Sequence, residues 1–261
     1  MNILCIGDIV GKPGRKVLEE ILPKLKEEFS LDCVVANAEN AAGGSGLTPR
    51  IAEQLFRAGC NVLTMGDHVF DRPELLEYFS EQPNIIRPEN FPSGNPGRGW
   101  VLIKTPTAAK VAVVNLLGRV FIKHYTDCPF QRIDALLKDI ARETPVVIVD
   151  FHAEATSEKI AMGWFLDGRV SAVVGTHTHI QTADERVLPK GTAYITDLGM
   201  TGPYDSVIGQ EREKIITRFL TGLPSRFEVA EENPLLCGVV IEVDETTGKS
   251  RTIRRIQRGL Q

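Results

Sequence analysis

The sequence predicts an α/β protein organised around a mixed β-sheet. Short apolar, β-branched runs alternate with amphipathic helical stretches, which is the pattern of strands joined by helices. Two strand-like runs in the middle of the chain are separated only by a short turn, which predicts an antiparallel pair in the same protein. The chain has 261 residues, of which 43% are hydrophobic and 25% charged, so one domain spanning residues 1–261 can bury its own core.

The first third of the chain is expected to alternate strands with helices. We expect strands at 2–7, 33–38, 62–65 and 85–87, and helices at 14–28, at 49–58 and from 73 onwards. The first helix has apolar residues spaced for one face: Val17, Leu18, Ile21, Leu22 and Leu25. Thr48 is the expected N-cap of the second helix, with Pro49 in its first turn and Gly59 at its end.

The rest of the chain is expected to add a hairpin, three helices and a strand-rich tail. The hairpin pairs 100–104 with 110–116; the helices are 130–142, 157–165 and 211–219; strands are expected at 146–151, 172–175 and 193–196. The tail is predicted as antiparallel strands at 227–230, 238–243 and 250–256, with a turn at 244–249. The Pro/Gly-rich segment 88–99 is expected either to cap a functional site or to contact another subunit. The second alternative would make the protein a homo-oligomer.

Composition restricts the partners and the compartment. The net charge is −4 and the pI about 5.8, so binding of long nucleic acid is not expected. A small anionic substrate is compatible with this charge. Arginines at 251, 254, 255 and 258 are interpreted as the solvated face of the last strand. The five cysteines are scattered and odd in number, which favours a reducing compartment. Neither a signal-peptide pattern nor an apolar run of ~18 residues is seen, so we expect a cytoplasmic protein without membrane contact.

Polar side chains follow five of the expected strands, at the point where each strand ends. They are Asp8, Glu39, Asn40, Asp67, His68, His152, His177 and His179, and they include four of the five histidines. Ligands of open α/β sheets bind at this edge. Each residue alone has an ordinary interpretation, such as a helix cap for Asp8, but their convergence favours a metal site.

The kinds of donor indicate which metals are expected. Imidazole, carboxylate and amide oxygen without thiolate suit manganese, iron or zinc better than magnesium or calcium. Three or four protein ligands serve one metal, so eight candidate groups predict two metal ions, or one metal ion and a catalytic group. Two ions can hold a phosphate between them and generate a hydroxide nucleophile from a bridging water.

These motifs resemble those of a known superfamily. Asp8, Glu39-Asn40, Gly66-Asp67-His68, His152 and the string GTHTH at 175–179 are similar to the D-x-H, G-D, G-N-H, H and G-H-x-H motifs of calcineurin-like metallophosphoesterases. The longer strings IGDIVGKPGR, NAENAAGGSGLT, FHAEATSEK, VVGTHTHIQTAD and TDLGMTGPYD resemble its YmdB-like branch across nearly the whole chain.

The resemblance implies a fold and a set of residue roles. The fold would be two mixed β-sheets packed face to face as a sandwich and flanked by helices. One metal would take Asp8, Glu39, Asn40 and His179, and the other Glu39, Asp67, His152 and His177. His68 would be the proton donor. Iron is the metal usually assigned in the branch, manganese commonly supports activity in the superfamily, and zinc is an alternative. The implied activity is phosphodiester hydrolysis, with 2′,3′-cyclic nucleotides as the substrate class.

Two positions depart from the superfamily pattern. Val10 stands where the D-x-H motif has a histidine, and we expect Asn40 to replace that ligand. Asp67 stands where G-N-H has a neutral amide. Our hypothesis is that the added carboxylate makes the site less electrophilic or lets it tolerate trivalent iron.

The expected function is therefore hydrolysis of small phosphodiesters by a metal-bridging hydroxide, with His68 as general acid. A role for His68 in orienting a ligand is the simpler alternative. A phosphomonoesterase or nucleotidase, and a metal-stabilised regulatory module with little catalysis, remain alternative functions. An RNase acting on polymers is disfavoured by the acidic balance. The loop 43–48 is interpreted as a connection that could also offer N–H groups to a phosphate. Residues 201–204 are either a rim that stacks a base or an ordinary turn.

Overall fold

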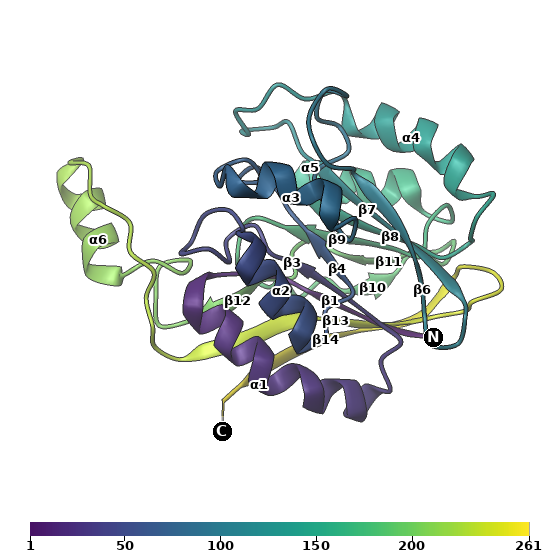
Figure 1. The fold of residues 1–261 in the computed structure, drawn as a ribbon, viewed down its shortest axis with the longest axis horizontal. Coiled ribbons are helices and arrows are strands. Elements are labelled where there is room, and N and C mark those ends of the chain that lie inside the picture. Colours follow the sequence, from purple (N-terminus) through teal and green to yellow (C-terminus); the bar gives the residue numbers. More distant parts are fainter. Residues whose placement is uncertain (261) are drawn as a thin grey trace.

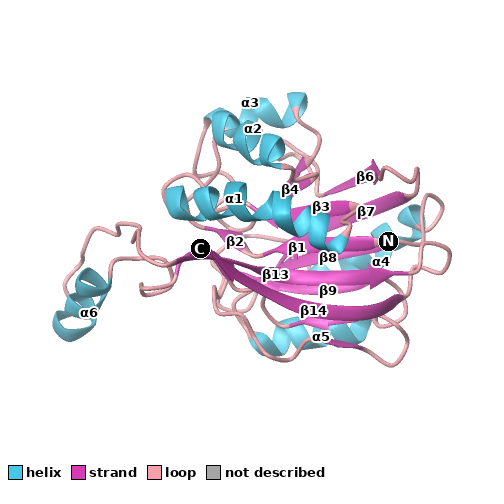
Figure 2. Cartoon of the chain, turned by 90° about the horizontal axis from the view of Figure 1, so that it is seen from below, coloured by secondary structure: helices cyan, strands magenta, loops and turns pink. Residues whose placement is uncertain are grey.

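Two mixed β-sheets pack face to face, and helices cover their outer faces (Figures 1 and 2). The computed structural model describes residues 1–260, so Gln261, the last residue of the expected domain, lies outside the described residues. The fold class predicted from the resemblance is confirmed, as are the helices and the central hairpin predicted from periodicity.

The first sheet has eight strands and contains the first and the last strand of the described residues. Its order is β2-β12-β13-β1-β3-β4-β5, with β14 paired to β13. The strands are β1 (Asn2–Ile6), β2 (Asp8–Ile9), β3 (Cys33–Asn37), β4 (Val62–Thr64), β5 (Ile85–Ile86), β12 (Met200–Pro203), β13 (Pro234–Val243) and β14 (Ser250–Gly259). The pairs β1–β3, β3–β4 and β4–β5 are parallel, whereas β13 runs antiparallel to β1 and β14.

The second sheet has six strands in the order β10-β11-β9-β8-β7-β6. They are β6 (Trp100–Lys104), β7 (Lys110–Leu117), β8 (Val147–His152), β9 (Ala172–Thr176), β10 (Arg186–Val187) and β11 (Ala193–Ile195). The central pairs β7–β8 and β8–β9 are parallel, and β6 forms the predicted antiparallel hairpin with β7. The carboxyl ends of β8 and β9 therefore lie at one edge.

Three hydrophobic layers hold the sandwich together. Alternate residues of β1 face opposite sides: Leu4 and Ile6 pack under the helices, while Ile3 and Cys5 pack against the other sheet. Helices α1 (Gly11–Phe29), α2 (Pro49–Ala58) and α3 (Glu74–Glu81) cover the first sheet. Helices α4 (Pro129–Ile140) and α5 (Thr156–Leu166) cover the second. The Thr48 hydroxyl accepts a hydrogen bond from the Ile51 N–H, as predicted for an N-cap.

One segment projects from this body (Figures 1 and 2). We call residues 205–231 the arm; it contains α6 (Arg212–Thr221), of which Ile215 alone is buried. The prediction of a strand at 227–230 is wrong. Val229 forms a single bridge with Gln210, and the segment returns along α6 instead of joining a sheet, so no ladder supports extended pairing.

Other short elements also differ from the predictions. Residues 201–203 are neither rim nor turn: they lie in β12 and are buried, and the Tyr204 hydroxyl contacts Cys237 Sγ at 2.9 Å. The two-residue strands β2 and β10 were not predicted, because each contains a single apolar residue, whereas β5, also of two residues, has two adjacent isoleucines. No helix within residues 1–260 combines the length and the apolar character needed to cross a membrane.

Candidate metal centre

The residues that follow the strands meet at one edge of the sandwich. Asp8 follows β1, Glu39 and Asn40 follow β3, and Asp67 and His68 follow β4 in the first sheet. His152 ends β8, and His177 and His179 follow β9 in the second sheet. The site therefore lies where the carboxyl ends of both sheets meet, as expected for ligands of parallel strands.

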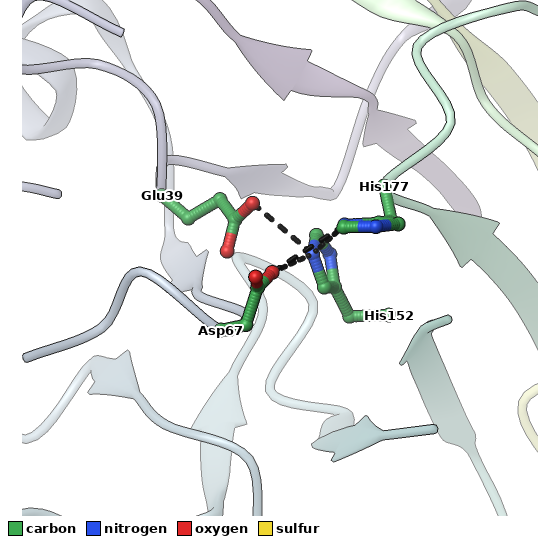
Figure 3. Close-up of side chains that lie close together, drawn as sticks. All are labelled: Glu39, Asp67, His152 and His177. Atoms are coloured by element: carbon green, nitrogen blue, oxygen red, sulfur yellow. Dashed lines mark hydrogen bonds and ion pairs between the residues drawn. The ribbon is translucent and has the colours of Figure 1, made fainter. Parts of the chain in front are cut away.

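Four of these residues form a compact cluster (Figure 3). Glu39, Asp67, His152 and His177 each place one ligand atom within 4.8 Å of the others. His152 Nε2 lies 3.1 Å from both Glu39 Oε1 and Asp67 Oδ1, and 2.9 Å from His177 Nδ1. These donors converge on one point from both sheets.

A second group adjoins this cluster. Asn40 Nδ2 lies 3.2 Å from His179 Nε2 and 3.2 Å from Glu39 Oε1, so Glu39 is shared between the two groups. Asp8 Oδ1 lies 4.0 Å from His179 Nε2 and 3.9 Å from His152 Nδ1. This oxygen is buried and has no hydrogen-bond partner among the described residues, which is costly for a carboxylate.

The backbone that carries the two last histidines is held in a left-handed conformation. The φ angles of His177 and His179 are 97° and 65°, a region that side chains other than glycine rarely adopt. Asp197 fixes the residue between them, because its Oδ2 accepts hydrogen bonds from the N–H and hydroxyl of Thr178 at 3.1 and 2.7 Å. The strain is thus supported by a buried carboxylate.

Each imidazole is oriented through its other nitrogen. His152 Nδ1 lies 2.9 Å from the Thr176 hydroxyl, which donates to Asp150 Oδ1 at 2.7 Å. His177 Nε2 lies 3.0 Å from Glu154 Oε2. His179 Nδ1 lies 2.9 Å from the carbonyl oxygen of Ile208 in the arm. Such partners fix ring orientation and tautomer in metal sites.

The sequence patterns did not single out these supporting residues. Asp150 and Glu154 stand two residues on either side of His152, so their proximity to a predicted ligand was the available signal. The site also requires Gly66, because a Cβ there would overlap Glu39 Oε2 and the His152 ring.

The electrostatics favour a bound cation. Burial disfavours the imidazolium of His152, yet Glu39, Asp67 and Asp8 outweigh it and raise the pKa of His152. Burial opposes ionisation of Asp67, but hydrogen bonds with His152 and His177 lower its pKa. Burial raises the pKa of Asp150 to about 6, although hydrogen bonds from the hydroxyls of Thr64 and Thr176 act to lower it. Buried carboxylates therefore create a negative potential at the cluster.

Two observations indicate that these residues are suited to binding metal. The donor atoms are carboxylate oxygens and imidazole nitrogens in convergent positions, and the buried Asp8 Oδ1 lacks a protein partner. Imidazole and carboxylate together suit transition metals. The cluster of Glu39, Asp67, His152 and His177, in the described part of the chain, could therefore hold a metal ion.

His68 stands beside the cluster with its ring partly exposed. Its Nδ1 lies 2.8 Å from Asp71 Oδ2, and its backbone N–H donates to Glu39 Oε2 at 3.3 Å. Burial disfavours the imidazolium, but Glu39, Asp67 and Asp71 outweigh it and raise the pKa of His68.

A cavity of about 820 Å³ opens over the cluster. Its floor includes Glu39, Asn40, His68, His177 and His179. The cavity is also lined by Gly43, Gly44 and Ser45 of the loop after Asn40, and by residues of the arm. None of residues 88–99, all of them described, lines this cavity, so the first alternative, a cap on the site, is wrong; contact with another subunit stays a prediction. The segment connects the two sheets, running from β5 to β6.

Comparison with known proteins agrees with this fold and site. Residues 4–256 match the family described as YmdB-like protein, and the chain belongs to this family. It is 52% identical over 256 residues to the 2′,3′-cyclic-nucleotide 2′-phosphodiesterase of Bacillus subtilis (strain 168), covering 98% of this chain and 96% of that protein. The predicted YmdB-like resemblance and enzyme class are therefore confirmed.

Solved structures show the same fold. A structure described as a novel phosphatase from Mycoplasma pneumoniae is similar with a TM-score of 0.93 and 38% identity, covering 99% of this chain and 93% of that chain. A hypothetical protein from Thermus thermophilus is similar with a TM-score of 0.92 and 39% identity, covering 99% of both chains.

Proposed function

We propose that the chain is a phosphodiesterase that hydrolyses 2′,3′-cyclic nucleotides with the help of two metal ions. The observation that carries the proposal is the cluster of Glu39, Asp67, His152 and His177, of which Glu39 and His177 line an open cavity. The activity of the Bacillus subtilis relative supplies the substrate class. We further propose that the chain forms one domain, since β1 from the start of the chain lies between β3 and β13.

Two overlapping sets of residues would hold the ions. One set is Asp8, Glu39, Asn40 and His179; the other is Glu39, Asp67, His152 and His177. The 3.2 Å contact of Asn40 with both Glu39 and His179 supports this division. Iron or manganese suits the donors best, with zinc as the alternative. Bound ions would supply Lewis acidity and a nucleophile derived from water.

His68 would donate the proton to the leaving oxygen. Its Nδ1 faces Asp71, so the imidazole is fixed with Nε2 available to a substrate in the cavity. The neighbouring carboxylates favour the protonated ring, as a general acid requires. Phe or Ala in place of this residue would leave the leaving alkoxide unprotonated.

The test uses purified protein that is stripped of metal and reloaded with Mn²⁺ or Fe²⁺. Turnover is measured with 2′,3′-cAMP, 3′,5′-cAMP and p-nitrophenyl phosphate, together with metal content. We expect metal-dependent turnover led by 2′,3′-cAMP. His68→Ala should keep the metal and lose roughly 10²–10⁴-fold in rate.

His124→Ala is the matched control, because His124 is exposed and does not line the cavity. Preferential turnover of p-nitrophenyl phosphate would favour a phosphomonoesterase. Two bound metals without turnover of any compound would favour a regulatory module. Wild-type rates in a metal-loaded His68→Ala variant would remove His68 as the proton donor and leave it the role of orienting a ligand.

A further inference from the structure

The arm contributes several of the residues that line the cavity over the proposed metal centre. We call its lining side chains, among them Ile208, Ile215, Arg218, Phe219 and Phe227, the arm wall. The arm is joined to the site directly, because the Ile208 carbonyl oxygen lies 2.9 Å from His179 Nδ1. The part of a bound substrate that extends beyond its reacting phosphate would therefore contact the arm wall.

Arg218 is the only lysine or arginine among the cavity-lining residues of the described chain. Its helix neighbours Arg212 and Lys214 are paired with carboxylates: Arg212 with Glu232 at 3.9 Å, and Lys214 with Glu211 at 3.0 Å. The Arg218 guanidinium instead lies over the Phe227 ring, 4.9 Å from its centroid. Stacking of this kind orients the guanidinium and leaves its N–H groups for an anion.

Two aromatic side chains of the same wall are open to solvent. Phe219 is 82% exposed and Phe227 53% exposed, although both line the cavity. Exposed phenyl rings beside an arginine are the arrangement by which proteins hold single-stranded nucleotides, with bases on the rings and phosphates on the cation. The floor holds carboxylates and imidazoles but no second cation for a further phosphate.

We propose that the arm wall is a subsite for the base and the 5′-phosphate of the substrate. Phe219 and Phe227 stack the base, and Arg218 pairs with the 5′-phosphate. The inference rests on the proposed function and narrows its substrate class to nucleotides that carry a second phosphate. That phosphate belongs either to a 5′-phosphorylated mononucleotide or to the end of a short oligonucleotide.

The test is calorimetric binding of product-like nucleotides to the manganese-loaded full chain. The probes are adenosine 3′-monophosphate, adenosine 3′,5′-bisphosphate and the dinucleotide ApAp. We expect the wild type to bind the bisphosphate at least about tenfold more tightly than the monophosphate, as for a charge-assisted pair. Arg218→Gln should remove this gain and leave the monophosphate Kd within about twofold. ApAp binding like the bisphosphate indicates an oligonucleotide end; ApAp binding like the monophosphate indicates a mononucleotide.

The aromatic part of the subsite is tested separately. Phe219→Ala/Phe227→Ala should weaken all three nucleotides by roughly 5- to 150-fold and leave inorganic phosphate binding unchanged. Leu220→Ala/Leu223→Ala is the matched control, because Leu220 and Leu223 are 81% and 65% exposed in the arm and do not line the cavity. Arg212→Gln is the control for charge. Far-UV circular dichroism reports whether the variants keep their fold.

Equal affinity of the wild type for monophosphate and bisphosphate would overturn the subsite. So would a phenylalanine double variant that changes the oligomeric state in sedimentation but leaves the nucleotide Kd values unchanged, because the arm would then be a contact between copies. Turnover of 2′,3′-cAMP by the same samples distinguishes the two proposals. Turnover without bisphosphate preference refutes only the subsite, and bisphosphate preference without turnover refutes only the catalytic function.

Discussion

Nε2 of His177 lies 3.0 Å from Oε2 of Glu154, while Nδ1 of the same ring lies 3.4 Å from Asp67 Oδ1. The ring is therefore held between a carboxylate of the cluster and one outside it. A partner of this kind fixes the orientation of a metal-binding imidazole and raises its basicity. Glu154 should thus control metal affinity without contacting the metal.

We expect Glu154→Gln to lower metal affinity by about 10–100-fold. The amide keeps the size of the side chain but removes the charge that orients His177. Metal retained after dialysis against a graded chelator measures the effect. Glu143→Gln, which removes an exposed carboxylate paired with Lys110, is the control. Equal metal retention in Glu154→Gln and wild type would show that the contact orients nothing.

Gly66 should be irreplaceable for a steric reason. A Cβ at this position would overlap the Glu39 carboxylate and the His152 imidazole, both of them proposed metal ligands. Gly66→Ala should therefore displace both ligands, at a cost of about 1–3 kcal/mol from overpacking. We expect loss of bound metal with retained secondary structure. Gly94→Ala, where a Cβ would meet nothing within 4 Å, should bind metal normally.

Asp67→Asn tests why a carboxylate stands where related motifs have an amide. Asp67 Oδ1 lies 3.1 Å from His152 Nε2, so the residue is well placed as a ligand. The neutral amide would leave Asp8 and Glu39 as the carboxylates that offset the charge of the two proposed cations. We expect weaker iron retention relative to manganese and an acid limb of the pH–rate profile shifted to lower pH. An unchanged profile with unchanged metal preference would reject our hypothesis for Asp67.

Much of the fold and of the candidate site follows from local patterns. The α2 helix carries its own signals, since Thr48, Pro49 and Gly59 specify where it begins and ends. The site residues were predictable because each follows an apolar strand, and parallel strands bring their carboxyl ends together. The face-to-face packing of the sheets needed the family resemblance, because both faces of β1 and β3 are apolar and periodicity alone does not say what covers them.

The remaining features depend on tertiary contacts that no local pattern encodes. Residues 227–230 read as a strand from their composition, but the arm gives Val229 only one bridge partner. Glu154 becomes a partner of His177 only when β8 and β9 are paired side by side. The cavity brings Ile208, Arg218 and Phe227 of the arm together with proposed ligands that are far away in sequence.

Lys159 and Asp197 form a buried ion pair that supports the last two histidines. Lys159 Nζ lies 2.7 Å from Asp197 Oδ2, and the two side chains are 1% and 0% exposed. Lys159→Met would leave the carboxylate buried without its cation, which typically costs about 3–5 kcal/mol. We expect a matching fall in the free energy of unfolding by urea. Lys110→Met breaks the exposed pair with Glu143 and should cost no more than about 1 kcal/mol. Similar losses of unfolding free energy in Lys159→Met and Lys110→Met would show that burial does not determine how much an ion pair contributes to stability.

Asp244 should make the tail hairpin sensitive to acid. Arg251 Nη2 donates to Asp244 Oδ2 at 2.8 Å, and the N–H groups of Thr246 and Thr247 donate to Oδ1 at 3.0 Å. The hydrogen bond from Arg251, followed by those from the two backbone N–H groups, lowers the pKa of Asp244 to about 2. A lowered pKa means that the carboxylate stabilises the folded state above its unfolded pKa of about 3.9 and that this contribution is lost as pH falls towards 2.

Asp244→Asn should therefore have a lower urea midpoint than the wild type at pH 6, with the difference shrinking between about pH 4 and pH 2 as the wild-type carboxylate becomes protonated. Asp139→Asn, on an exposed face of α4, is the control for removing one charge. A difference between Asp244→Asn and wild type that stays constant over this range would mean that the charge of Asp244 does not stabilise the turn.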